Sequence, residues 1–235
     1  MTLQSSFLFN QRVFEWEEKV FPEILQVNDP GKPRVYRTPD GKTYESVSNF
    51  LGRHSDSTWV KEWREKVGDK KADAISKRAT DRGTLLHSHL ESYIQNKDPK
   101  ERSPLFGQLK PSIDMRLGKV YAQECRVFSN KLKIAGTLDL LAQWYQKDSV
   151  LDWKSSTRVK TEKDAHGYLL QGTLYSIMVQ ELTGFIADQI VVVIATEASN
   201  KPTIIVKNRK KYVEEIMDLI RKDRGVVKTE TTRLF

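Results

Sequence analysis

The sequence predicts a mixed α/β (α+β) fold, in which a central mixed sheet is flanked by helices. Stripes of apolar residues at helical spacing alternate along the chain with short β-branched runs. The run at residues 187–196 is apolar enough for a strand that is buried on both faces. The composition, 38% hydrophobic and 30% charged with a single cysteine, is typical of a globular domain without disulfides.

The elements are expected in the following order. Residues 34–47 predict a hairpin with a Pro-Asp-Gly turn, and Ser48 is the expected N-cap of a short helix. Residues 71–95 predict one helix or two, and residues 98–112, which contain three prolines, predict a loop. From residue 82 onward the expected order is α-β-β-β-α-β-β-α, with strands at 119–129, 133–145, 149–155, 187–196 and 203–207, and helices at about 165–182 and 208–224.

The chain contains no internal repeat and no low-complexity linker. Residues 1–80 are expected to form an N-terminal extension that packs on or caps a core of residues 81–235, within one structural domain. No apolar run approaches the roughly 20 residues of a membrane span. The N-terminus lacks the basic start of a secretory signal.

The net charge is +8 and the isoelectric point is near 9.4. A basic globular protein often binds a polyanion, most commonly nucleic acid, although an ordinary basic surface gives the same numbers. The charge therefore favours nucleic acid as a partner without establishing it.

Two carboxylates and an ammonium lie in a predicted hairpin at residues 136–157. Asp139 and Asp152 can face each other on adjacent strands, where facing positions are about 5 Å apart. Buried carboxylates at that distance repel unless a cation lies between them, and oxygen ligands favour Mg²⁺ or Mn²⁺. Alternation places Lys154 on the face of Asp152, with Trp153 on the other face. The alternative is a structural salt bridge from Asp139 to Lys154 or Arg158.

Two further pairs are spaced one helical turn apart. His87 and Glu91 share a face of one predicted helix, whereas His89 points elsewhere. Gln171 and Tyr175 share a face of the helix that follows the Asp152 strand. Alone, each pair is a weak signal, since a helical histidine is more often structural than a metal ligand.

Taken together, these residues follow a recognisable order. The chain reads Arg-Gly-x-x-x-His-x-x-x-Glu at 82–91, then Glu124, then Gly-x-x-Asp at 136–139, Asp-x-Lys at 152–154 and Gln-x-x-x-Tyr at 171–175. This order resembles the RecB-like branch of the PD-(D/E)XK nuclease superfamily, and looks most like its phage and mitochondrial genome maintenance exonucleases. The resemblance covers about residues 82–183. It implies a restriction-endonuclease-like core with the order α-β-β-β-α-β.

The resemblance also implies roles for individual residues and two bound ions, Mg²⁺ or Mn²⁺. The implied metal ligands are His87, Asp139, Asp152 and the backbone carbonyl of Trp153, with Glu91 and Glu124 as further candidates. The implied catalytic residues are Lys154, Asp152, Asp139, Gln171 and Tyr175. Since Cys125 is the only cysteine, the iron–sulfur cluster of some relatives is not expected.

The implied activity is metal-dependent hydrolysis of phosphodiester bonds from DNA ends, with single-stranded DNA preferred, in phage or bacterial DNA replication, recombination or degradation. The alternatives are a structure-selective endonuclease on the same fold and an inactive DNA-binding module. The expected location is the cytoplasm, that of a bacterial host if the chain is phage-encoded, with the mitochondrial matrix as the alternative. No membrane partner is expected.

Five basic residues are candidates for holding the DNA backbone. For Arg82 the alternative is a structural salt bridge, and for the others it is a solvated surface. The five are Arg82, Lys131, Lys133, Arg158 and Lys160.

Overall fold

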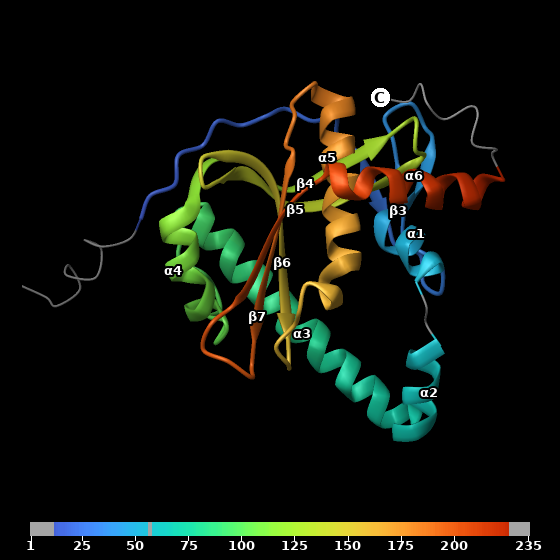
Figure 1. The fold of residues 1–235 in the computed structure, drawn as a ribbon, viewed down its shortest axis with the longest axis horizontal. Coiled ribbons are helices and arrows are strands. Elements are labelled where there is room, and N and C mark those ends of the chain that lie inside the picture. Colours follow the sequence, from blue (N-terminus) through green and yellow to red (C-terminus); the bar gives the residue numbers. More distant parts are fainter. Residues whose placement is uncertain (1–11, 56–57, 226–235) are drawn as a thin grey trace, which may run out of the picture.

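The computed structural model describes residues 12–55 and 58–225, and within these ranges an eight-stranded mixed sheet is flanked by helices (Figure 1). The predicted mixed α/β architecture is therefore confirmed. The strands are β1 (Leu25–Val27), β2 (Val35–Arg37), β3 (Thr43–Ser46), β4 (Leu117–Ser129), β5 (Ile134–Trp144), β6 (Lys147–Ser156), β7 (Gln189–Thr196) and β8 (Thr203–Asn208). The α-helices are α1 (Val47–His54), α2 (Thr58–Val67), α3 (Asp69–Ile94), α4 (Phe106–Arg116), α5 (His166–Thr183) and α6 (Lys210–Arg224).

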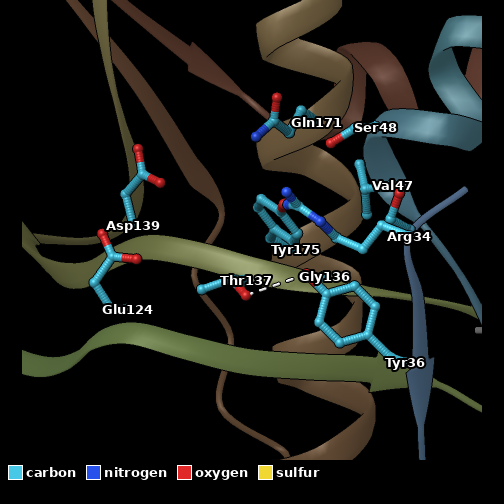
Figure 2. A pocket seen from close by; sticks show the side chains of 11 residues that line it. Arg34, Tyr36, Val47, Ser48, Glu124, Gly136, Thr137, Asp139, Gln171 and Tyr175 are labelled. Carbon is cyan, nitrogen blue, oxygen red and sulfur yellow. Dashed lines mark hydrogen bonds between the residues drawn. The ribbon is translucent and has the colours of Figure 1, made fainter. Parts of the chain in front are cut away.

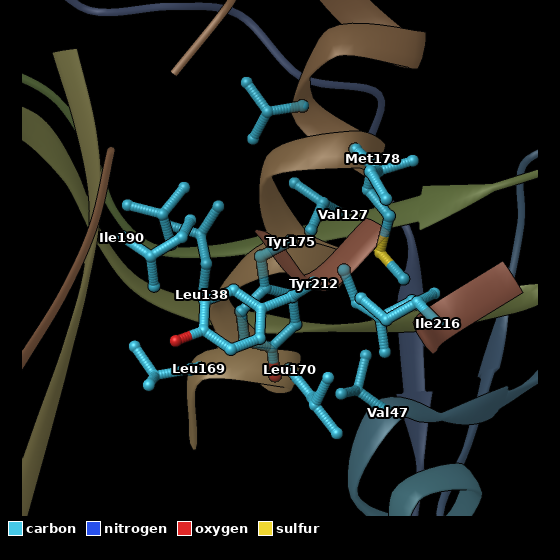
Figure 3. Close-up of a cluster of buried hydrophobic side chains, with 14 of the residues drawn as sticks. Val47, Val127, Leu138, Leu169, Leu170, Tyr175, Met178, Ile190, Tyr212 and Ile216 are labelled. Atoms are coloured by element: carbon cyan, nitrogen blue, oxygen red, sulfur yellow. The ribbon is translucent and has the colours of Figure 1, made fainter. Parts of the chain in front are cut away.

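The sheet separates two apolar cores. One face packs against α1, α5 and α6 around side chains such as Leu138, Leu174 and Ile190 (Figure 3). The other face packs against α3 and α4 around Leu90 and Trp153. Strand β7 is apolar on both faces because helices cover both sides of the sheet there, which explains its near-continuous apolar run.

Strand β5 has three neighbours rather than two. Strand β4 pairs with it in antiparallel fashion along nearly its whole length, and so occupies one edge. The other edge is shared: β3 pairs with residues 134–135 in parallel, and β6 pairs with residues 140–144 in antiparallel fashion. Residues 136–139 therefore have no ladder partner on that edge, and the sheet forks there.

A two-residue turn joins β5 to β6. Tyr145 and Gln146 have φ angles of 52° and 62°, which lie in the left-handed region. Two consecutive positive φ angles match the twist of antiparallel strands and fix the hairpin register, in which Trp144 faces Lys147.

The loop expected at residues 98–112 is present only as far as residue 105, because α4 begins at Phe106 and contains Pro111. Phe106, Leu109 and Ile113 are buried on one face of this helix, and their burial outweighs the backbone hydrogen bond that proline cannot donate. The order from α3 onward thus contains one more helix before the first core strand than the resemblance implied.

The N-cap of α1 differs from the expectation, and the structure settles whether residues 71–95 contain one helix or two. The N-cap of α1 is Ser46, not Ser48: the Ser46 hydroxyl accepts a hydrogen bond from the Asn49 backbone N–H at 3.1 Å. Residues 71–95 form one continuous helix, α3, in which Gly83 is an interior residue. Helix α3 spans the boundary expected between residues 80 and 81, and β3 of the N-terminal extension pairs directly with β5.

Among the described residues, no helix combines the length and the apolar character needed to cross a membrane.

Helix α5 approaches β7 closely at Gly172. A Cβ atom there would lie 2.5 Å from Cγ2 of Ile190. We expect Gly172→Ala to lower the free energy of unfolding by about 1–3 kcal/mol, because the added methyl overpacks the core. Gly167→Ala is the matched control in the same helix, since its Cβ would meet no atom within 4 Å. Urea unfolding of both variants checks this, and equal stabilities would contradict the close approach.

Candidate metal centre

Three acidic residues lie side by side on three adjacent strands at the fork in the sheet. In the ladder of β4 and β5, Glu124 and Asp139 both lie between the pair Gln123–Leu140 and the pair Cys125–Leu138. The β5–β6 ladder stops at the pair Leu140 and Leu151, so Asp139 and Asp152 are the next positions in line. The fork therefore brings three carboxylates into one row.

Glu124 has a φ angle of 47°, which is rare for a residue other than glycine. The β4–β5 pairing skips this position and resumes on either side of it. Such a conformation costs on the order of 1–3 kcal/mol and is most often kept at functional sites. Neither residue type nor spacing indicates it in the sequence.

The Asp139 carboxylate takes over the role of a missing main-chain acceptor. Its Oδ2 accepts a hydrogen bond of 2.8 Å from the backbone N–H of Trp153, just beyond the end of the ladder. Asp139 is 9% exposed and Asp152 is 1% exposed. Both are thus fixed within the sheet rather than solvated at its surface.

His87 reaches this row from α3. Its Nε2 lies 2.9 Å from the carbonyl oxygen of Trp153, and its Nδ1 lies 3.7 Å from Glu124 Oε1 and 3.9 Å from Asp139 Oδ1. Burial lowers the pKa of the imidazole, but the nearby carboxylates of Glu124 and Asp139 outweigh it and raise the pKa to about 9. His89, on another face of α3, instead accepts a hydrogen bond from the Ser103 backbone N–H.

Lys154 is paired with Asp152, on the shared face that alternation predicts. Its Nζ lies 2.6 Å from Asp152 Oδ1, which also accepts a 3.2 Å hydrogen bond from Gln171 Nε2. The alternative salt bridge to Asp139 is not the one formed here, and Arg158 pairs with Asp164 at 2.6 Å. Burial raises the pKa of Asp152 to about 6, while the carboxylates of Asp152 and Asp139 outweigh burial and raise the pKa of Lys154.

The row of acids has the geometry of a cation site. One donor atom each from His87, Glu124 and Asp139 lie within 4.8 Å of one another, so these residues could bind a metal ion. Asp152 Oδ2 is buried and has no hydrogen-bond partner, which is costly for a carboxylate oxygen unless a cation meets it. The donors fit a hard divalent ion, since they are mainly carboxylate oxygens with one imidazole.

Tyr175 explains the glycine of the Gly-x-x-Asp segment. A Cβ atom at Gly136 would lie 2.6 Å from Cε1 of the Tyr175 ring, so only glycine lets the ring lie against β5. The ring fills the space beside the unpaired edge and is 4% exposed. Its burial raises the pKa of the phenol well above its usual value.

A pocket of ≈ 210 Å³ opens along the unpaired edge of β5 (Figure 2). Glu124, Asp139 and Gln171 line it on the side of the core. Arg34 and Tyr36, from the N-terminal extension, line it on the other side, and Figure 2 shows Arg34 pointing toward Tyr175. Sequence reasoning missed both N-terminal residues, because their place depends on the pairing of β3 with β5.

The other predicted residues lie outside this row. Glu91 lies one turn beyond His87, and its carboxylate accepts a hydrogen bond from Gln95. Arg82, in the middle of α3, donates to Ser155 Oγ at 3.2 Å and lies 3.4 Å from Glu197. The structural salt bridge that was the alternative for Arg82 is therefore formed, with Glu197. The contact with Ser155, the residue after Lys154, also places Arg82 near the candidate site.

The four remaining basic candidates are divided between two places. Lys131 and Lys133 lie in the turn between β4 and β5, about 20 Å along β5 from Asp139. Arg158 and Lys160 follow the end of β6, beyond Lys154. The second pair is therefore nearer to the row of acids along the chain.

Comparison with known proteins adds little. No protein-family model matches the chain, and no curated protein matches it. Among solved structures, the chain is similar to the crystal structure of SSO0001, with a TM-score of 0.36, 13% identity, and coverage of 75% of this chain and 84% of that chain.

The row of acids predicts metal binding that can be measured directly. We expect the protein to bind Mn²⁺ in isothermal titration calorimetry, and Asp139→Asn to weaken that binding by more than roughly tenfold. Asp73→Asn is a matched control, because Asp73 is exposed on α3 and paired with Arg64. Equal Mn²⁺ affinity in all three proteins would argue against a metal centre here.

Proposed function

We propose that this chain is a metal-dependent DNA exonuclease of the RecB-like PD-(D/E)XK type. One observation carries the proposal: at a fork in the sheet, the implied ligands His87, Asp139 and Asp152 converge with Glu124, and Lys154 pairs with the innermost acid. A purely structural salt bridge needs one acid and one base. It does not need three aligned carboxylates and a buried oxygen without a partner.

His87, Glu124, Asp139, Asp152 and the carbonyl of Trp153 would hold Mg²⁺ or Mn²⁺, one ion or two. A divalent ion there would supply Lewis-acid stabilisation of the charge that develops on a phosphate during hydrolysis. The position of Glu124 beside His87 and Asp139 supports a metal-binding role for this residue. Glu91, the other further candidate, is set apart from the cluster.

Lys154 has the position of a catalytic lysine. Its ammonium is held by Asp152 and lies 5.0 Å from the centroid of the Tyr168 ring, so its direction is fixed before substrate binds. There it can orient an attacking water and offset charge on the phosphate oxygens. Gln171 holds Asp152 in turn, and Tyr175 closes the unpaired edge of β5.

The pocket beside the metal centre supports action at a DNA end. Its far side is formed by residues of the N-terminal extension, including Tyr36 and Val47, so a strand that enters past the acids meets a wall. Arg34 supplies a guanidinium in that pocket, where a phosphate could pair with it. A bounded pocket suits a terminal nucleotide better than a continuous strand.

The first test is degradation of end-labelled linear DNA. We expect Mg²⁺-dependent release of nucleotides or short oligonucleotides that EDTA abolishes, and a loss of about 10²–10³-fold in rate for Lys154→Ala. Lys77→Ala is the control, because Lys77 forms an exposed ion pair with Asp81 on α3. Wild-type protein that binds DNA but does not cleave it with Mg²⁺ or Mn²⁺ would leave only a binding module.

Circular DNA separates the exonuclease from the endonuclease alternative. We expect closed single-stranded circles to remain intact under conditions that degrade the same DNA after linearisation, because the bounded pocket requires an end. Gel electrophoresis of both forms over time gives the answer. Conversion of circles to linear molecules would instead favour an endonuclease on the same fold.

A further inference from the structure

A second pocket, of ≈ 440 Å³, lies between α1, the first turns of α5, and α6. Its volume is in the range of small-molecule sites. Leu51, Leu170, Leu219 and the ring of Tyr168 form its apolar walls. The described residues that line it include no lysine and no arginine.

This second pocket adjoins the candidate metal centre. Ser48 and Gln171 line both pockets, and Gln171 also donates to Asp152. Tyr168 stands between the second pocket and the ammonium of Lys154. A group that occupies the second pocket would therefore lie next to a phosphate at the metal centre.

The two histidines of the second pocket are each paired with an acid. His166 lies 2.8 Å from Glu215, and His54 lies 3.2 Å from Asp223. A phosphate there would face Glu215 without a lysine or arginine partner, and so would be repelled. An uncharged planar group could stack on the apolar walls and meet the imidazoles and the carboxylate with its polar edge.

We propose that the second pocket binds an unpaired nucleobase of the DNA strand whose neighbouring phosphate lies at the metal centre. This inference rests on the proposed nuclease function and specifies its substrate. A base in duplex DNA is paired and stacked, so it would have to leave the helix to enter the pocket. The pocket therefore selects single-stranded ends or strands that have been unpaired at the end.

The test uses single-stranded oligonucleotides that carry one abasic site, placed at successive positions along the strand. For the wild-type protein, we expect a lesion at one position relative to the cleaved bond to slow cleavage roughly tenfold, since one base contact is lost. Lesions elsewhere should have smaller effects. This measurement needs no variant, so it does not depend on how any substitution folds.

The matched variant is Gly52→Phe. Gly52 lines the second pocket on α1, and a Cβ atom there would meet nothing within 4 Å, so a side chain can begin at this position without a backbone clash, and the ring is intended to take up space in the pocket. This variant should cleave intact DNA more slowly and should lose the penalty for the lesion. Gly107→Phe, at an equally open helical glycine that lines neither pocket, should keep the wild-type pattern.

A wild-type rate that is equally sensitive to every lesion position would overturn the base pocket while leaving the nuclease intact. So would a full lesion penalty in Gly52→Phe. If the wild-type protein cleaves no DNA, the nuclease proposal fails.

The base pocket can then be tested by fluorescence anisotropy of the same labelled oligonucleotides in EDTA. An abasic site at one position should weaken binding to the wild-type protein but not to Gly52→Phe. Equal binding of intact and abasic strands by the wild-type protein would refute the base pocket.

Discussion

The edge of β5 is shared between β3 and β6, and the candidate site depends on the gap that this sharing leaves. A strand offers two edges, and β4 occupies one of them completely. On the other edge, the parallel pairing of β3 and the antiparallel pairing of β6 leave residues 136–139 between them without a ladder partner. Buried backbone groups need partners, and the Asp139 carboxylate supplies one by accepting from Trp153 N–H. The gap thus places an acid where a regular sheet would have a carbonyl.

The positive charges of His87 and Lys154 offset only part of the charge of the three acids around this gap. Glu124, Asp139 and Asp152 are aligned, and the ammonium of Lys154 reaches only one oxygen of Asp152. The other oxygen of Asp152 is buried without a partner. Glu124 is exposed, but Asp139 and Asp152 are buried, and a buried carboxylate without a partner costs several kcal/mol, on the order of the net stability of a whole domain. A divalent ion in the row would meet oxygens of all three carboxylates together, which a single lysine cannot do.

Local patterns in the sequence predict most of the core. Strands β5, β6 and β7 and helix α5 lie within a few residues of their expected bounds, because their apolar periodicity and the glycine at the end of α5 are local signals. Helix α4 was not predicted because three prolines in this stretch are typical of a loop. The helix forms because it buries apolar side chains, which the local sequence does not reveal. The conformation of Glu124 and the position of Arg34 depend on pairing between distant strands. No window of sequence contains that information.

The same long-range pairing divides the site into two parts. The acids, Lys154 and the Tyr175 ring belong to strands and to the buried middle of α5, so neighbours on both sides fix their positions. The walls of the two pockets come largely from β2, α1 and the first turns of α5, which are shorter or more exposed. If the chain has the proposed function, substitutions in those walls would alter which strand end fits while the row of acids stays in place. The proposed chemistry and the proposed substrate choice would then be separable in this fold, although Gln171 lines both pockets and contacts Asp152.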